Sequence, residues 1–119
     1  MSEPEATQAP VKQPVPTIHE AELASGASGA VIRGPEIDFA IAVARRQTQE
    51  NVVVCGNDLR ANARLAARIE AAVGRYVRGK AHRRLAGPFA LPHYQQEDED
   101  HGGHTFYETP NVRAVRRQP

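Results

Sequence analysis

The sequence of 119 residues contains no tryptophan, three tyrosines and three phenylalanines, so aromatic residues make up only 5% of it. A core with few rings has to rest on Ala, Val, Ile and Leu, which bury less area per residue than aromatic side chains do. A single domain of this size buries only a modest core. We therefore expect a thin core, which a second copy of the chain could complete in a homodimer.

Cysteine occurs once, as Cys55, which excludes an intrachain disulfide and fits a reducing compartment. At the end of an apolar stretch, Cys55 is expected to be a buried small hydrophobe rather than a nucleophile. No apolar run approaches the ~18 residues needed to cross a bilayer, and the N-terminal residues lack the pattern of a secretory signal. The sequence predicts a soluble protein without a membrane partner, made in the cytoplasm, with delivery by a signal-independent route left open.

The net charge of +1 conceals an asymmetry between the two parts of the chain. Residues 1–44 hold two basic and six acidic side chains, whereas residues 45–119 hold thirteen basic and eight acidic ones. A basic part of this kind indicates a polyanionic partner, of which nucleic acid is the commonest. The alternative is a solvated surface on which Arg is used for its helix propensity.

The pattern predicts an α+β domain, with two main helices packed on a small sheet, over residues 30–119. Residues 1–29, rich in Pro and Ala, are expected to form a flexible, disordered arm and linker. Within this arm, Thr17 and Glu20 have the spacing of a capping box, which predicts one or two helical turns from Thr17 to Ala24.

Two helices are expected, over residues 35–48 and 58–73. Pro35 suits the first turn of the first helix, and Ile37, Ile41 and Ala44 define its apolar face. The second helix is expected to begin at an N-cap formed by Asn57 or Asp58 and to end at Gly74. Its apolar stripe contains Leu59, Leu65, Ala66, Ile69, Ala72, Val73 and Tyr76.

Strands are expected over residues 30–33 and 51–55, from a start within residues 90–94, and over residues 104–108. The β-branched run 52–54 is typical of a strand buried on both faces. The last two strands are expected to pair as a hairpin across the acidic connection. Residues 75–90 are expected to be irregular and basic, and the tail from Arg113 to be frayed.

Four of the five histidines fall within 23 positions, as His82, His93, His101 and His104. Three interpretations remain open. A pair of imidazoles acts as general base and general acid on a phosphodiester, with an Arg or Lys stabilising the developing charge. Alternatively, His101 and His104 bind a divalent metal together with His93 or an acidic residue. In the third interpretation the histidines are only polar turn residues.

Several other side chains are candidates for the same site. Tyr107 and Glu108 lie beside the histidines in sequence, and His104, Phe106 and Glu108 would share one face of a strand. The candidates for phosphate binding are basic residues of the second helix and of the segment after it: Arg60, Arg64, Arg68, Lys80, Arg83 and Arg84. The three helical arginines recur every four residues and therefore lie along one side of the helix.

The runs 87–95 (GPFALPHYQ) and 103–108 (GHTFYE) resemble the C-terminal toxin domains of bacterial RHS-type polymorphic toxins, over about residues 50–114. This resemblance implies a toxin or effector domain of bacterial competition, often a nuclease, that a cognate immunity protein holds inactive. It implies that His93, His104 and Glu108 lie at the active centre. We expect no cofactor, with a divalent metal at His101 and His104 as the alternative. The acidic residues 97–100 would oppose phosphate binding nearby. The alternative function is a non-enzymatic interaction module or secretion-system adaptor that binds a protein or nucleic acid.

Overall fold

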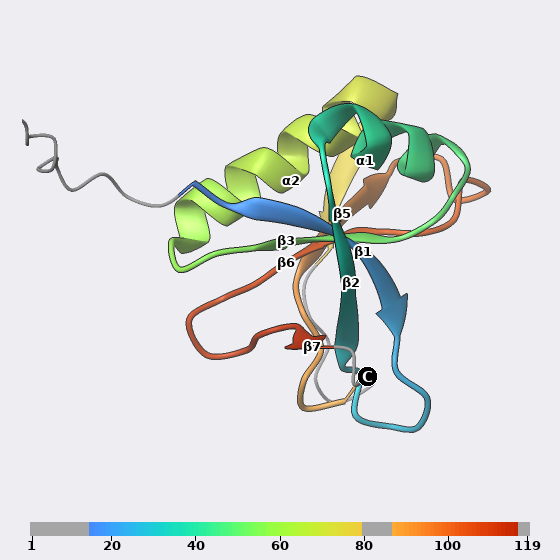
Figure 1. Cartoon of the computed structure of the whole chain (residues 1–119). Helices are drawn as coiled ribbons and strands as arrows, with labels where there is room; N and C mark the ends of the chain where they lie inside the picture. Colours follow the sequence, from blue (N-terminus) through green and yellow to red (C-terminus); the bar gives the residue numbers. More distant parts are fainter. Residues whose placement is uncertain (1–14, 80–86, 117–119) are drawn as a thin grey trace, which may run out of the picture.

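A computed structural model describes residues 15–79 and 87–116 (Figure 1). These residues form two helices and a mixed sheet, which confirms the predicted α+β class. The elements in chain order are β1 (Thr17–Leu23), β2 (Val31–Ile37), α1 (Phe39–Gln47), β3 (Val52–Cys55), α2 (Leu59–Val73), β4 (Tyr76–Gly79), β5 (His93–Gln96), β6 (Thr105–Tyr107) and β7 (Val115–Arg116).

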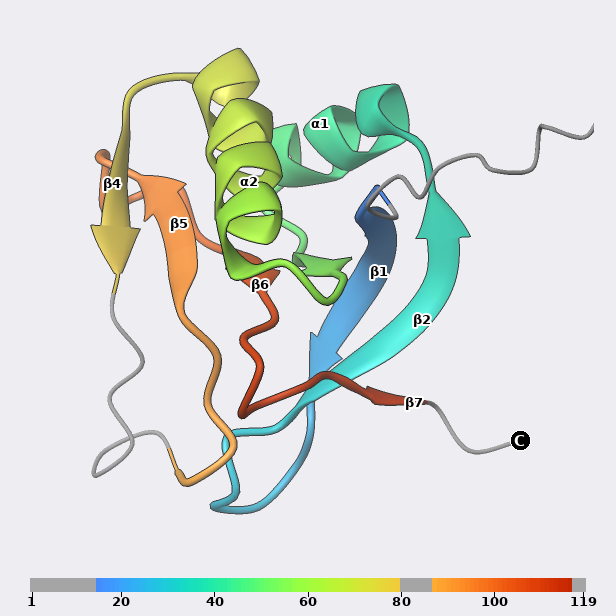
Figure 2. The same cartoon turned by 90° about the vertical axis from the view of Figure 1, so that its left-hand side faces the viewer.

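The seven strands lie in the order β4-β5-β6-β3-β1-β2-β7. Two neighbouring pairs, β3 with β6 and β2 with β7, are parallel, and the other pairs are antiparallel. Both helices lie on the same side of this sheet (Figure 2). We call the opposite side the helix-free face, because no helix of the described residues packs on it.

The main core lies between the helices and the sheet and is built from Ile18, Ala42, Val52, Val54, Ala66, Ile69 and Tyr107. Each helix begins at a capping carboxylate: Asp38 accepts a hydrogen bond from the N–H of Ile41, and Asp58 accepts from Arg60 and Ala61. These side chains satisfy backbone donors that a helix start leaves without intrahelical partners. The N-cap at Asp58 and the end of α2 at Gly74 confirm the predicted boundaries of the second helix.

The helix-free face has a smaller apolar cluster of its own. It contains Ala21, Val31, Val53, Cys55, Leu91, Phe106 and Val112. Leu91 and Val112 belong to segments 87–92 and 108–114, which contribute side chains where the other face has helices. Cys55 is buried in this cluster, as predicted, and its burial raises the pKa of the thiol to about 12.

The segment Thr17–Leu23 is a strand, so the predicted helical turns are wrong, and this part of the expected arm belongs to the sheet. It pairs with both β2 and β3, and backbone pairing on two sides outweighs a local capping signal. The hydroxyl of Thr17 contacts the Cys55 carbonyl at 3.5 Å instead of capping a helix. The other part of the expected arm, residues 1–14, lies outside the described residues.

Helix α1 also differs from its prediction, because it begins at Phe39 and leaves Pro35 in β2. Its buried positions are Ala42 and Arg46, whereas Ile41 is 49% exposed. Residues 76–79, expected to be irregular, form edge strand β4. Val115–Arg116, in the tail expected to be frayed, form β7 on the other edge. The β5–β6 hairpin is confirmed. None of the helices among the described residues has the length and apolarity to span a membrane.

Candidate functional site

The structure brings His93 and His104 into direct contact on the helix-free face. Their ring centroids are 4.3 Å apart, and the rings are tilted by 43°. His93 of β5 is the cross-strand partner of Phe106 in β6, and His104 precedes Phe106 by two residues. Strand alternation therefore places all three rings on one side of the sheet. Both imidazoles meet the ring of Phe106 edge to face, at 5.6 and 5.4 Å. We call His93 and His104 the histidine pair.

The backbone around His104 is fixed by contacts with the end of α1 and the start of β3. The His104 N–H donates to the Asn51 side chain at 2.8 Å, and the Gly102 N–H donates to the Gln49 side chain at 2.9 Å. Gly103 has a φ of +85°, a conformation that favours glycine. The loop is thus held before β6 begins, and this fixes where the His104 ring can lie.

His93 is fixed from the neighbouring edge strand. Its Nε2 lies 2.8 Å from the Gln95 side-chain oxygen. The ring lies over Gly79, its cross-strand partner in β4, where a Cβ atom would overlap the imidazole. The absence of a side chain at Gly79 therefore makes room for His93.

The environment of His104 favours its neutral form. Burial lowers the pKa of His104 to about 4, and the charges of His93 and Arg46 act in the same direction, whereas Glu70 opposes them. At neutral pH the ring is therefore uncharged. Its Nδ1 is buried and has no hydrogen-bond partner among the described residues. Buried polar atoms without partners are uncommon in folded proteins.

A buried ion pair lies behind the loop that carries His104. Arg46 of α1 and Glu70 of α2 are both 0% exposed, and Arg46 Nε donates to Glu70 Oε2 at 2.5 Å. The guanidinium also donates to the carbonyls of Gly102 and Gly103, at 3.1 and 3.2 Å. Sequence analysis missed both residues. The one signal that could have indicated them is that Arg46 and Glu70 are charged residues in otherwise apolar helix faces.

The carboxylate of Glu70 has partners on the sheet as well. Thr105 Oγ1 donates to Glu70 Oε2 at 2.5 Å, and Gln96 Nε2 donates to Glu70 Oε1 at 2.7 Å. The ion pair therefore connects both helices to β5 and β6. His101, the other member of the predicted metal site, points to this region, because its Nε2 lies 2.6 Å from the Arg46 carbonyl oxygen. The described residues contain no group of three or more His, Cys, Asp or Glu side chains that could hold a metal ion.

Glu108 is not brought to the histidine pair. It lies four residues beyond His104, which is roughly 13 Å along an extended chain. The residue is 4% exposed, and its carboxylate accepts from the N–H groups of Gly56 at 3.1 Å and Ala114 at 2.8 Å, and from Arg113 at 3.2 Å. Glu108 therefore holds the segment after β6 against the end of β3.

Tyr107 lies on the opposite side of the sheet from the histidine pair. It is 1% exposed within the main core, its ring stacks on Tyr94 at 5.6 Å, and its hydroxyl accepts from Arg78 Nε at 3.3 Å. Its position between the sheet and the helices gives it a packing role.

The arginines of α2 are also separated from the histidine pair by the sheet. Arg60, Arg64 and Arg68 are exposed on a helix that covers the other face (Figure 2). The Arg68 guanidinium lies over the Phe39 ring at 5.4 Å. These three residues therefore cannot act on a group bound at His93 and His104. Lys80, His82, Arg83 and Arg84 lie outside the described residues.

Of the predicted site residues, the structure thus brings together His93 and His104. To these it adds Gly79 and Gln95 beside His93, and Asn51 behind His104. Two imidazoles in contact, one of them kept neutral, are suited to moving a proton between them and a bound group. Comparison of the chain with known protein families, curated proteins and solved structures finds no match.

Proposed function

We propose that this protein is a hydrolytic nuclease of the toxin or effector type, in which His93 and His104 form the proton-transfer pair. The observation that supports this is the contact between the two imidazoles, 4.3 Å apart and half-buried on the helix-free face. A proton-transfer pair needs two titratable rings within reach of one substrate, together with an environment that separates their protonation states.

The charges of the pair assign a role to each ring. Two positive charges at this distance repel each other, so the pair binds its first proton far more readily than its second. Because burial keeps His104 neutral, the proposed reaction starts with the proton on His93. His104 then acts as the base and His93 as the acid. A phosphate bound nearby raises the pKa of His104 by attraction, which strengthens it as a base while the substrate is present.

The reaction that fits such a pair is the cleavage of RNA without a metal ion. His104 removes the proton from a ribose 2′-hydroxyl, whose oxygen attacks the adjacent phosphorus. The bond from phosphorus to the 5′-oxygen breaks, and His93 delivers its proton to that oxygen. The products are a 2′,3′-cyclic phosphate and a 5′-hydroxyl end, and a proton has moved from His93 to His104. Water then opens the cyclic phosphate: His93 takes a proton from the water, whose oxygen attacks the phosphorus, and His104 gives its proton to the leaving 2′-oxygen. This hydrolytic step yields a 3′-phosphate and returns the pair to its starting state.

A second function is favoured by the surface of α2. Its one carboxylate, Glu70, is buried, so the exposed side carries Arg60, Arg64 and Arg68 without an acidic residue of the same helix beside them. In this alternative the protein is a non-enzymatic interaction module, and α2 is its contact surface for an acidic protein such as a cognate immunity protein.

Cleavage of labelled RNA and DNA by the purified full chain, in the presence of EDTA, tests the nuclease proposal. We expect His93→Ala and His104→Ala each to lower the rate of RNA cleavage by about 100-fold or more, the lower end for a lost acid or base. His19→Gln is the matched control, because His19 lies on the same face but is bonded to Gly34 and Thr17.

The two variants and the control are to be compared by circular dichroism, so that a loss of folding is not mistaken for a loss of catalysis. Expression in bacteria gives a second measurement, since the active chain is expected to halt growth and the His93→Ala chain to permit it. Full RNA cleavage by both histidine variants would refute the pair as catalytic residues. Growth arrest that persists in both variants and depends on Arg60 and Arg64 would favour the interaction module.

A further inference from the structure

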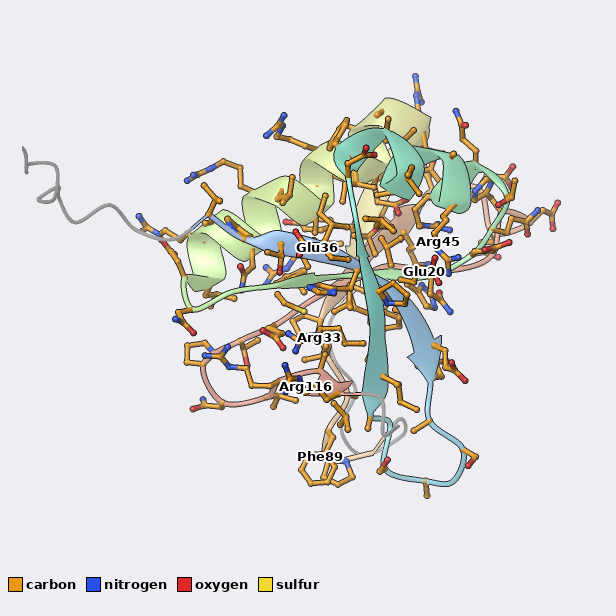
Figure 3. The ribbon with its side chains drawn as sticks, viewed as in Figure 1. Glu20, Arg33, Glu36, Arg45, Phe89 and Arg116 are labelled. Carbon is orange, nitrogen blue, oxygen red and sulfur yellow. The ribbon has the colours of Figure 1, made fainter. Side chains whose placement is uncertain are left out.

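Arginines from two distant parts of the chain gather on the helix-free face, near its β2–β7 edge. Arg33 of β2 and Arg116 of β7 are aligned as partners in a parallel pair of strands. Aligned residues of neighbouring strands have side chains on the same side of the sheet. Arg33 is also the partner of Ala21, a member of the apolar cluster on the helix-free face, which places both arginines on that face. Figure 3 shows the two side chains beside one another.

Arg113 joins this group through Glu108. Its guanidinium contacts the Glu108 carboxylate at 3.2 Å and the Asn57 side chain at 2.9 Å. Arg33 of β2 lies near Glu108 as well, because both residues influence the pKa of the Cys55 thiol: Arg33 lowers it and Glu108 raises it. We call Arg33, Arg113 and Arg116 the arginine cluster.

The charge of this cluster is not balanced by its one carboxylate. Glu108 already accepts hydrogen bonds from Gly56 and Ala114, so it offers the three guanidinium groups one negative charge with few free positions. Glu36, the one carboxylate of β2, lies farther along the strand toward the helices (Figure 3). Like charges on aligned strands destabilise a sheet by repulsion, and an anion between them relieves it.

We propose that the arginine cluster binds the phosphate backbone of single-stranded RNA, on the same face as the histidine pair. A guanidinium group can donate two parallel hydrogen bonds to the oxygens of one phosphate, and Arg33 and Arg116 provide two such groups from neighbouring strands. Two strands, β3 and β1, lie between β6, which follows His104, and β2, which carries Arg33. Three strand spacings correspond to roughly 14 Å across the sheet. An RNA strand held at the cluster therefore reaches the histidines a short distance farther along its backbone.

The choice of RNA rests on the proposed function, whereas the location of the binding surface does not. The alternative surface is α2, whose arginines the sequence pattern favours. Arg33 and Arg116 lie on the helix-free face, whereas α2 covers the other face, so paired substitutions distinguish the two surfaces. Arg33→Gln/Arg116→Gln removes two charges from the cluster, and Arg60→Gln/Arg64→Gln removes two charges from α2. All variants carry His93→Ala, so that bound RNA is not cleaved.

The measurement is the fluorescence anisotropy of a labelled single-stranded RNA between 50 and 300 mM NaCl. This range gives the dependence of log Kd on log salt, whose slope is about 0.7 per phosphate contact of a single strand. Loss of two contacts should lower the slope of log Kd against log salt by about 1.4 and weaken binding about tenfold or more. We expect this for the cluster variant, and a change below about twofold for the α2 variant because distant charges are screened. Arg116→Glu, at an exposed position, provides a second test if the double variant fails to fold.

The proposal is overturned if the α2 variant loses binding and the cluster variant keeps it, or if both lose it equally. It is also overturned if the His93→Ala chain does not bind RNA at 50 mM NaCl, or if it binds polyglutamate as tightly as RNA. Binding that depends on the cluster, together with full cleavage by both histidine variants, would refute the catalytic pair and retain the cluster.

Discussion

Breaking the buried ion pair between Arg46 and Glu70 should destabilise the fold severely. The substitution Glu70→Gln keeps the size of the side chain and removes its charge. It leaves the Arg46 guanidinium, which is 0% exposed, without a counter-charge. Removal of one partner of a buried pair costs about 3–5 kcal/mol, because the remaining charge stays out of water. Domains of this kind have a total stability of about 5–15 kcal/mol, so the variant should be close to the limit of folding.

The size of this loss can be checked by chemical unfolding. Urea denaturation at pH 7.5, followed by circular dichroism, gives the free energy of unfolding for the wild type, Glu70→Gln, Arg46→Met and the double variant Arg46→Met/Glu70→Leu. We expect each single variant to lose about 3–5 kcal/mol and the double variant to lose at least about 2 kcal/mol less than their sum, because it leaves no unpaired charge.

A matched control comes from the surface pair next to it. Arg45 and Glu50 approach to 2.7 Å, with 21% and 55% of their side chains exposed. Since water and salt screen such a pair, Glu50→Gln should cost less than about 1 kcal/mol. The reasoning is refuted if Glu70→Gln costs no more than Glu50→Gln, or if the losses of the two buried variants simply add.

Two further predictions concern the histidine pair. The pKa of His104 is about 4 in the folded protein, against an ordinary value of 6.5 that applies to the unfolded chain. Between these pH values the unfolded chain binds a proton at His104 and the folded chain does not. The free energy of unfolding therefore falls as the pH drops from 6.5 to 4. After allowance for partial exposure of the ring, the loss amounts to about 1–2 kcal/mol. In urea denaturation, His104→Asn should therefore lose less stability than the wild type between pH 7.5 and 4.5. An equal loss in both chains would contradict this prediction. Gly79→Ala should displace the His93 ring and lower the rate of RNA cleavage by about tenfold or more, since a shift of about 1 Å at a reacting group has effects of this size. The control Val77→Ala, on the same strand, should leave the rate unchanged. A further loss of rate when Gly79→Ala is added to His93→Ala would show that the glycine acts in another way.

The elements that sequence analysis predicted correctly are those whose signals are local. The run Val52–Val54 indicated a strand covered on both faces, and in the fold it pairs with β1 and β6 and is fully buried. Helix α2 has an N-cap at Asp58 and a stop at Gly74, which are short-range signals of backbone geometry. The two strands of the β5–β6 hairpin are joined by a single acidic connection, so their pairing too is visible in the sequence.

The elements that were missed depend on partners far away in the chain. Strand β1 has an irregular pattern, with a change of register between His19 and Ala21, and it is held by β3, more than thirty residues on. Local pattern analysis therefore favoured the capping signal of Thr17. The face of α1 was misassigned for a related reason, because a buried Arg46 is acceptable only where Glu70 meets it, and no periodicity in α1 indicates that residue.

The candidate site, like the fold, was predictable from the sequence only where local signals determine it. Strand alternation correctly placed His104 and Phe106 on one face, and the hairpin placed His93 beside them. Alternation gives the side of the sheet but not the distance along a strand, and for this reason Glu108 was grouped with His104. Tyr107 has the opposite parity, which places it on the other face from His104, and the helices on that face place it in the main core.

The same limit explains why sequence analysis and structure point to different anion-binding surfaces. Arg60, Arg64 and Arg68 form a visible row because helix periodicity brings them together in one segment of sequence. Arg33 and Arg116 are more than eighty residues apart, and only the parallel pairing of β2 with β7 makes them neighbours. A row on a helix that covers one side of the sheet cannot serve a site on the other side. If the histidine pair acts on RNA, its phosphate contacts must come from the face that carries the pair, and there the fold gathers arginines that no local pattern connects.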